Sequence, residues 1–167
     1  MAPDTRSAGL YSSEFVWKRR IAAPPSDEGG VVPGIDVTAM LHDAAIDLVT
    51  ELFGANDLKS LSRLAARPVL QAISAVFNGP IVPETPVLIG ATLGSLSERS
   101  FVLTTAVWLA ENGCLLAHGT ANFVIVDVAS RRTVAVPDNV VGALRSLRPQ
   151  SPLPRPRPTR QPPNSTS

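Results

Sequence analysis

The sequence predicts an α+β fold in which one long central helix is wrapped by a twisted antiparallel β-sheet of about five strands. Apolar residues recur at helical spacing in only one long stretch, residues 37–53. Most of the chain after it consists of short apolar segments separated by Pro, Gly and Asn, a pattern typical of strands. Because the helix and the sheet each have one large apolar face, we expect the sheet to curl around the helix.

Composition limits the classes of function. The chain has 167 residues, 44% hydrophobic and 17% charged, which fits one globular domain with a sizeable core. Its 15 basic and 14 acidic residues are balanced, and several basic residues lie near the C-terminus, so we expect no nucleic-acid partner. One cysteine and two histidines argue against a disulfide framework and a zinc site, so no metal and no cofactor is expected.

The two ends of the chain differ from its middle. Residues 1–13 are small and polar, and residues 148–167 are crowded with Pro, Arg, Ser and Thr. We expect both to be disordered tails, which leaves residues 14–147 as the folded domain. No apolar run reaches the ~18 residues of a membrane span, and the N-terminus has no apolar signal core. We therefore expect a cytoplasmic protein without a membrane partner.

The first elements are a strand, a bend and the central helix. The strand is predicted over residues 15–21 and ends at Pro24-Pro25. The bend over residues 26–32 contains Asp27 and two glycines, and Asp36 is a suitable N-cap for the helix that follows, with Gly54 as its stop. The helix is predicted from its apolar positions, which are Val37, Met40, Leu41, Ala44, Ala45, Leu48, Val49, Leu52 and Phe53.

After a loop or short helix over residues 55–67, strands are predicted at residues 69–77, 87–93, 101–109 and 114–126. They are expected to form an antiparallel meander. Asn112-Gly113 indicates a two-residue hairpin turn of type I′, in which both residues have positive φ. A short helix is predicted over residues 137–147.

The bend places a carboxylate at the mouth of the central helix. Free backbone N–H groups and the helix dipole favour negative oxygen at a helix start, so Asp27 beside Gly29-Gly30 is suited to attack a polarised carbonyl. The alternative is purely structural, with Asp27 capping a turn that the glycines bend.

The order of these parts resembles the hotdog-fold acyl-thioester hydrolases, specifically the 4-hydroxybenzoyl-CoA thioesterase-like branch. Members carry an Asp-x-Asp-x-x-Gly-x-Val pattern after a basic first strand, and residues 25–32 follow it without a gap. Asp27 falls on the second, catalytic Asp and Gly30 on the Gly. The resemblance spans roughly residues 14–147. It implies hydrolysis of an acyl thioester of coenzyme A or of an acyl carrier protein.

The resemblance also implies roles for residues. Asp27 would be the nucleophile or the general base, and the backbone N–H of Gly34 the oxyanion donor. Substrate contacts would come from Gly30, Val32 and Asp36. The phosphates of coenzyme A or of a carrier-protein arm need basic partners, for which we name Arg99, Arg131 and Arg132, with Arg63 and Arg67 as weaker candidates.

The chain departs from the family pattern at three places. Pro25 replaces the first Asp, Pro33-Gly34 replaces an aromatic pair, and Asp36 stands where Asn is common. These departures leave open an alternative function, a non-catalytic protein of the same fold that binds acyl thioesters or acyl carriers. A hydratase or dehydratase of this fold is disfavoured, because no His lies near Asp27 before His42.

Other chemistry-bearing residues have weaker cases. Another hotdog branch uses a carboxylate of the central helix, so the acidic face formed by Asp43, Asp47 and Glu51 is a second candidate set. We interpret His42 as a surface or interface residue and His118 as a sheet residue with its own partner. Cys114 follows the hairpin turn without a neighbouring base, which argues against a nucleophilic role.

The resemblance implies assembly as well. The family's active site lies across a dimer interface, and edge strands favour pairing between subunits, so we expect a homodimer or a homotetramer. Rich Ala, Arg, Pro and Val usage suggests a high-GC genome, in which related enzymes serve polyketide biosynthesis. A polyketide-pathway acyl chain is therefore one expected substrate.

Overall fold

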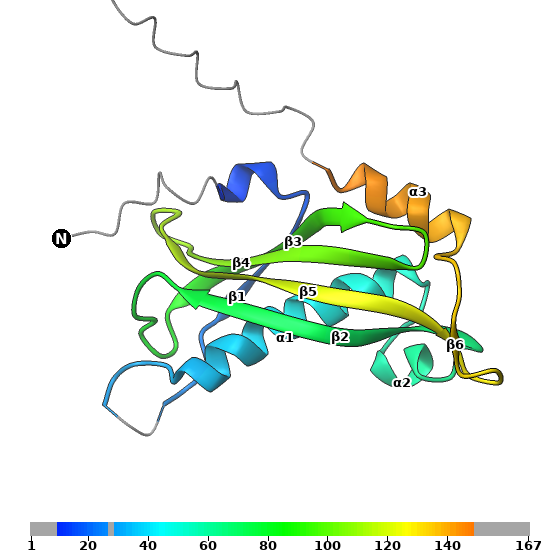
Figure 1. Ribbon diagram of the computed structural model, residues 1–167. Coiled ribbons are helices and arrows are strands. Elements are labelled where there is room, and N and C mark those ends of the chain that lie inside the picture. The colour runs from blue at the N-terminus through cyan, green and yellow to red at the C-terminus, as the bar shows by residue number, and fades with distance from the viewer. Residues whose placement is uncertain (1–9, 27–28, 149–167) are drawn as a thin grey trace, which may run out of the picture.

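A computed structural model describes residues 10–26 and 29–148 of the chain. The elements follow in the order 3-10 helix η2 (Ser12–Glu14), β1 (Trp17–Ala22), α1 (Gly34–Leu52), α2 (Leu58–Leu61), β2 (Ala66–Phe77), β3 (Pro86–Leu96), β4 (Ser100–Leu109), β5 (Leu115–Asp127), β6 (Arg132–Thr133) and α3 (Asp138–Ser146). The helix α1 crosses one face of a strongly curled antiparallel sheet (Figure 1). The expected α+β architecture is therefore confirmed.

The strand order in the sheet is β1-β3-β4-β5-β2, with the short strand β6 paired to β5. Strands β3, β4 and β5 form the expected meander. The expectation that β2 continues this meander next to β3 is wrong, because β2 pairs with β5 at one edge of the sheet and β1 pairs with β3 at the other. Both edge strands come from the first half of the chain, and α1 connects them across the sheet.

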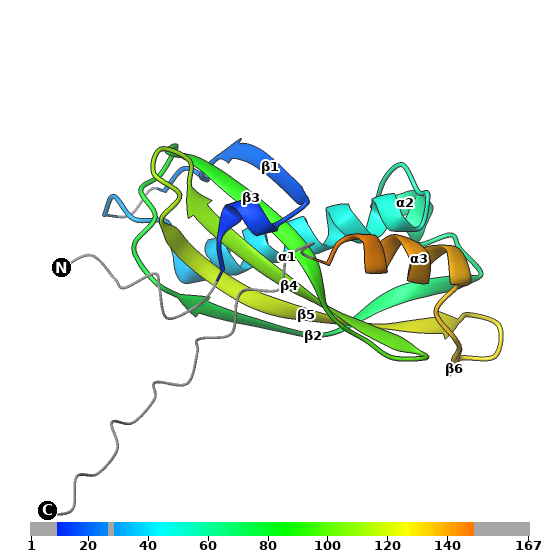
Figure 2. The ribbon, with the colours of Figure 1, turned by 90° about the horizontal axis from the view of Figure 1, so that it is seen from above.

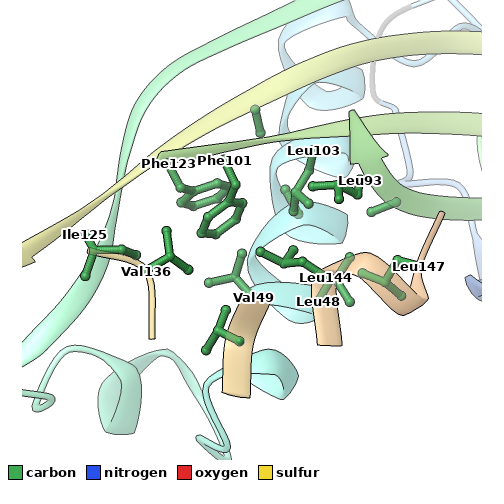
Figure 3. Packing of buried hydrophobic residues seen from close by; sticks show 14 of the residues in the cluster. Leu48, Val49, Leu93, Phe101, Leu103, Phe123, Ile125, Val136, Leu144 and Leu147 are labelled. Atoms are coloured by element: carbon green, nitrogen blue, oxygen red, sulfur yellow. The ribbon is translucent and has the colours of Figure 1, made fainter. Parts of the chain in front are cut away.

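The core fills the space between α1 and the concave face of the sheet. One cluster joins the C-terminal half of α1 to β3, β4, β5 and α3, with Leu48 and Val49 of the helix packed near Leu144 of α3 (Figure 3). In the same cluster the rings of Phe101 and Phe123 stack with centroids 5.3 Å apart. A second cluster packs the N-terminal half of α1 against β3, β4 and β5.

The other face of the sheet is covered in part by the N-terminal segment (Figure 2). Phe15 meets the Trp108 ring edge-on at 4.7 Å between centroids, and the indole N–H of Trp108 donates to the carbonyl of Leu10 at 3.1 Å. Residues 10–13, which the sequence analysis assigns to a tail, thus lie against the sheet. The predicted tails over residues 1–9 and 149–167 lie outside the described residues.

Two local expectations are wrong for identifiable reasons. The helix begins at Gly34 with Pro33 as its N-cap, so Asp36 belongs to the first turn and does not cap it. The turn between β4 and β5 spans the five residues 110–114, of which only Gly113 has positive φ, at 71°. Asn112 contributes through its side chain instead, since its Oδ1 accepts a hydrogen bond from the Cys114 amide at 2.9 Å.

Among the described helices, none combines the length and the apolar character needed to cross a membrane.

Candidate active site

The bend before α1 contains two glycines in a conformation with positive φ, and a hydrogen bond at Val32 ties its end to the turn after β2. Gly29 and Gly30 have φ values of 72° and 75°, a conformation that only glycine adopts without strain. The chain then joins the core at Val32, whose side chain is buried and whose amide donates to the carbonyl of Ile81 at 2.8 Å. Asp27, the predicted nucleophile or base, lies outside the described residues together with Glu28.

The start of α1 offers free hydrogen-bond donors. The amides of Asp36 and Val37 both donate to the carbonyl of Pro33, at 3.0 and 3.1 Å. No acceptor for the amides of Gly34 and Ile35 is found within residues 10–26 and 29–148. The first amides of any helix lack intrahelical acceptors, and the helix dipole adds positive charge there. An oxyanion at this position would find two donors aligned with a 19-residue helix.

Beside the helix start lies a pocket of about 390 Å³. Its wall comes from the bend, from the first turn of α1 and from the turn after β2, and its lining residues are Val31, Val32, Gly34, Val37, Phe77, Asn78, Gly79, Pro80 and Ile81. A Cβ added to Gly34 would lie 3.4 Å from the Phe77 ring, so the absence of a side chain keeps the backbone accessible there. Among the described residues that line it, the wall is apolar apart from one amide side chain and includes no charged side chain.

That amide side chain belongs to Asn78, directly after β2. Its Oδ1 lies 2.8 Å from Nδ1 of His118 on β5. The backbone amides of Asn78 and Gly79 both donate to the carbonyl of Leu116, at 2.9 and 3.2 Å. The turn is thus tied to β5 by three hydrogen bonds, and to the helix start through Ile81 and Val32.

The predicted substrate residues separate into two groups. Val32 and Gly34 line the pocket, whereas Gly30 is exposed in the bend and Asp36 is partly buried in the first turn of α1. The three predicted phosphate-binding arginines lie beside the C-terminal end of β5, where β6 pairs with it, and Figure 1 shows β6 at the end of the sheet away from the start of α1. Arg132 in β6 pairs with the end of β5, and Arg99 donates to the carbonyl of Thr133 at 3.3 Å. The length of β5 separates them from the pocket by about 40 Å.

The weaker basic candidates also lie away from the pocket. Arg67 is near the start of β2 and donates to the carbonyl of Ser62, and Arg63 is exposed after α2. Within one subunit, therefore, none of the five arginines named from the sequence meets the helix start. Among the described residues, no cluster of three or more His, Cys, Asp or Glu is arranged to hold a metal ion.

The helix carboxylates are engaged elsewhere. Asp47 lies 2.6 Å from Arg19 of β1, and Glu51 accepts from the indole N–H of Trp17 at 3.1 Å. Asp43 is exposed beside His42, with 3.3 Å between its Oδ1 and the His42 Nδ1. Asp47 and Glu51 line a hollow at the C-terminal half of α1, away from the helix start. Asp47 and Glu51 are thus paired with residues of β1 rather than directed at the pocket.

The sequence analysis named none of residues 77–81 as site residues. Two signals are present in the printed sequence. Phe77 is a large aromatic residue at the very end of a strand, and Asn78-Gly79-Pro80 is a turn sequence that follows it at once. Neither signal shows that the turn folds against the start of α1, because that contact depends on where β2 pairs in the sheet.

Comparisons with known proteins give the fold. No protein-family model matches the sequence, and no curated protein is a significant match. Solved structures are similar over most of the chain. The PA5185 protein from Pseudomonas aeruginosa superimposes with a TM-score of 0.71 at 19% identity, covering 85% of this chain and 98% of that one.

Two further structures carry functional descriptions. Slr0204, a 1,4-dihydroxy-2-naphthoyl-CoA thioesterase from Synechocystis, has a TM-score of 0.68 at 20% identity and covers 80% of this chain and 96% of its own. The SAV2348 protein from Staphylococcus aureus, solved in complex with CoA, has a TM-score of 0.70 at 11% identity, with coverages of 83% and 89%. Together with the strand order and the central helix, these similarities show that the chain has the hotdog fold.

Proposed function

We propose that the protein hydrolyses acyl thioesters of coenzyme A or of an acyl carrier protein. The observation that carries the proposal is the pair of amides at Gly34 and Ile35, which have no acceptor among the described residues and lie at the positive end of α1 beside a pocket with apolar described walls. Thioester hydrolysis needs donors for a developing oxyanion and an apolar space for the acyl group. The fold is shared with a 1,4-dihydroxy-2-naphthoyl-CoA thioesterase, which supports the same reaction class.

In this mechanism the thioester carbonyl oxygen lies against the helix-start amides. Asp27, five residues before Val32 in the sequence, attacks the carbonyl carbon to form a mixed anhydride, or accepts a proton from the attacking water. In both routes negative charge moves to the carbonyl oxygen, and the Gly34 amide and helix dipole stabilise it. In the first route the thiolate leaves as the anhydride forms, and water then hydrolyses the anhydride to the acid. In the second route the intermediate formed by water expels the thiolate and yields the acid directly, and the proton held by Asp27 is released to the thiolate or to solvent.

The acyl group would occupy the pocket, with Val32 and Val37 on one side and Phe77 and Ile81 on the other. The thiol-bearing half would extend over the surface. A fold neighbour solved in complex with CoA supports coenzyme A as the carrier of the acyl group. A carrier protein presents the same pantetheine arm, and the polyketide-pathway substrate expected from the sequence belongs to this finer part of the proposal.

We further propose that the active unit is a homodimer, with a homotetramer formed if two dimers pair. Strand β2 is an edge strand with exposed apolar side chains at Val69, Val76 and Phe77, and such an edge favours pairing with a second copy. An antiparallel two-fold pairing of β2 would bring Arg131 of the partner subunit and Arg132 of the partner subunit towards the helix start. That arrangement would reconcile their distance within one chain with a role in phosphate binding. Sedimentation equilibrium measures the subunit number.

Asp27→Asn tests the catalytic assignment. Thiol release is followed with a panel of short, long and aromatic acyl-CoA thioesters, together with the same acyl groups on a carrier protein. We expect Asp27→Asn to lower kcat/KM by at least roughly a hundredfold, the scale of loss for a catalytic group. Glu28→Gln is the matched control, since it removes the neighbouring carboxylate, and we expect it to change kcat/KM by less than about threefold.

Three results discriminate among the alternatives. Equal activity of Asp27→Asn and the parent protein would remove Asp27 from the mechanism. Binding of acyl-CoA without any turnover would favour the non-catalytic acyl-thioester binding protein. After a single turnover in isotopically labelled water, label in the Asp27 carboxylate would establish the nucleophilic route, because water can label that carboxylate only by attacking its carbon in the anhydride.

A further inference from the structure

The pocket at the helix start has one polar side chain, and that side chain is held in place. Asn78 is the only pocket-lining residue, among those described, whose side chain can hydrogen-bond. Its amide oxygen faces Nδ1 of His118 at 2.8 Å, a contact that is a hydrogen bond when Nδ1 carries the proton. The oxygen of Asn78 is then occupied.

The amide nitrogen of Asn78 is left with its hydrogens unused. No hydrogen bond from it to another described residue is found, and Asn78 is partly exposed to solvent. The backbone around it is fixed, because the amides of Asn78 and Gly79 share the carbonyl of Leu116. A donor that is oriented by a second residue and anchored through its own backbone loses little freedom on binding a ligand. The pair therefore presents a preorganised donor in an otherwise apolar wall.

We infer that Asn78 is a specificity-determining residue, and that it selects acyl groups carrying a hydroxyl or carbonyl oxygen beyond the thioester. This inference rests on the proposed function for the identity of the ligand as an acyl thioester. An unsubstituted acyl group would leave the Asn78 donor without a partner once water is displaced, which disfavours that group. A hydroxyl both donates and accepts, so it would satisfy this side chain with the amide in either orientation.

His118 acts through Asn78 and is a positioning residue. It lies on β5 opposite Val76 of β2, the second residue before Asn78, so the side chains of positions 78 and 118 meet at the end of the strand pair. Without the imidazole, the amide of Asn78 would rotate freely. The ligand would then have to fix the orientation of the Asn78 amide on binding, which lowers affinity but does not change the rate of thioester cleavage in the bound complex.

The test compares matched substrates. Hydrolysis and binding are measured for butyryl-CoA against 3-hydroxybutyryl-CoA and for benzoyl-CoA against 4-hydroxybenzoyl-CoA, with non-hydrolysable thioether analogues for the binding arm. We expect the parent protein to favour the oxygenated member of at least one pair by about 3- to 10-fold in kcat/KM and in affinity, the range that one neutral hydrogen bond supplies. Asn78→Leu should abolish this ratio, chiefly through a loss of kcat/KM and affinity for the oxygenated member.

Two further variants separate specificity from folding. Asn122→Leu is the matched control, because Asn122 lies farther along β5 and does not line the pocket, and it should keep the parent ratio. His118→Phe should lower the ratio through KM, with kcat within about twofold of the parent value. A parent protein without preference, or an Asn78→Leu protein that retains it, would overturn the inference while hydrolysis itself stands. Conversely, absence of hydrolysis with the binding ratio intact would refute the proposed activity and keep the role of Asn78.

Discussion

Thr105 is a buried hydroxyl without a partner, and this makes a sharp prediction about stability. It lies on β4 and is 1% exposed, and its Oγ1 has no hydrogen-bond partner among the described residues. Leu103 and Val107, two positions away on either side, belong to the clusters packed against α1. Because side chains alternate along a strand, Thr105 points into the same apolar layer.

We predict that Thr105→Val raises the free energy of unfolding by about 1–2 kcal/mol. An unsatisfied buried hydroxyl costs roughly 1–3 kcal/mol, and valine has nearly the same shape without the polar atom. With a urea m-value of about 2 kcal/mol/M, the midpoint of unfolding should rise by roughly 0.5–1 M with m unchanged. Urea titrations followed by tryptophan fluorescence and by circular dichroism measure the shift.

Thr92→Val is the matched control, with the opposite sign. Thr92 on β3 is also buried, but its hydroxyl donates to the carbonyl of Leu147 at 2.6 Å. Removing that donor leaves a buried carbonyl unpaired, so we expect a loss of about 1–2 kcal/mol. A Thr105→Val protein that is less stable than the parent would refute the reasoning, because it would show that the Thr105 hydroxyl is satisfied in the folded protein.

Two other predictions concern single sites. Gly119→Ala should lower the free energy of unfolding by about 2–3 kcal/mol, because the added Cβ would lie 1.9 Å from the carbonyl oxygen of Ser74. Gly142→Ala in α3, where the added Cβ meets open space, should raise it by about 0.5–1 kcal/mol in the same urea assay. The Ser60 amide lowers the pKa of Asp57 below its ordinary 3.8, so the carboxylate's stabilisation is present above pH 3.8 and is lost as pH falls through the folded pKa. As pH falls across this range, the free energy of unfolding of the parent protein should therefore fall more steeply than that of Asp57→Asn. Parallel curves of this free energy against pH would contradict the prediction.

The central helix could be predicted because its signal is local. Every apolar position named for it from Val37 to Val49 is buried in the structure. Its start was misplaced by three residues, since the first turn contains Gly34 and the exposed Ile35 and therefore lies outside the apolar stripe. Apolar residues at helical spacing indicate only the part of a helix that packs against the core. A first turn that does not pack against the core therefore cannot be predicted from this spacing.

The sheet order and the composition of the pocket could not be predicted in the same way. Each strand has its own local pattern, but whether β2 pairs with β3 or with β5 depends on how α1 carries the chain across the sheet. That choice decides which residues meet the helix start. It places Phe77 and Asn78 there, and it leaves Arg131 and Arg132 at the far end of β5. The presence of an arginine in the sequence does not indicate at which end of the sheet it lies, so the predicted phosphate contacts could not be placed.

The acidic residues of α1 are spread along the helix, with Asp36 in the first turn and Asp43, Asp47 and Glu51 farther on. The acidic residues Asp47 and Glu51 lie on its C-terminal half, where the helix dipole disfavours negative charge. Arg19, at 2.6 Å from Asp47 and 3.8 Å from Glu51, offsets that cost, and its guanidinium also lies over the Trp17 ring. These exposed pairs add little to stability. Their larger consequence is positional, because Arg19 holds Asp47 and Glu51 away from the pocket, whose lining within the described residues carries no charged side chain. A developing oxyanion there would be stabilised by the helix start without competition from Asp47 or Glu51.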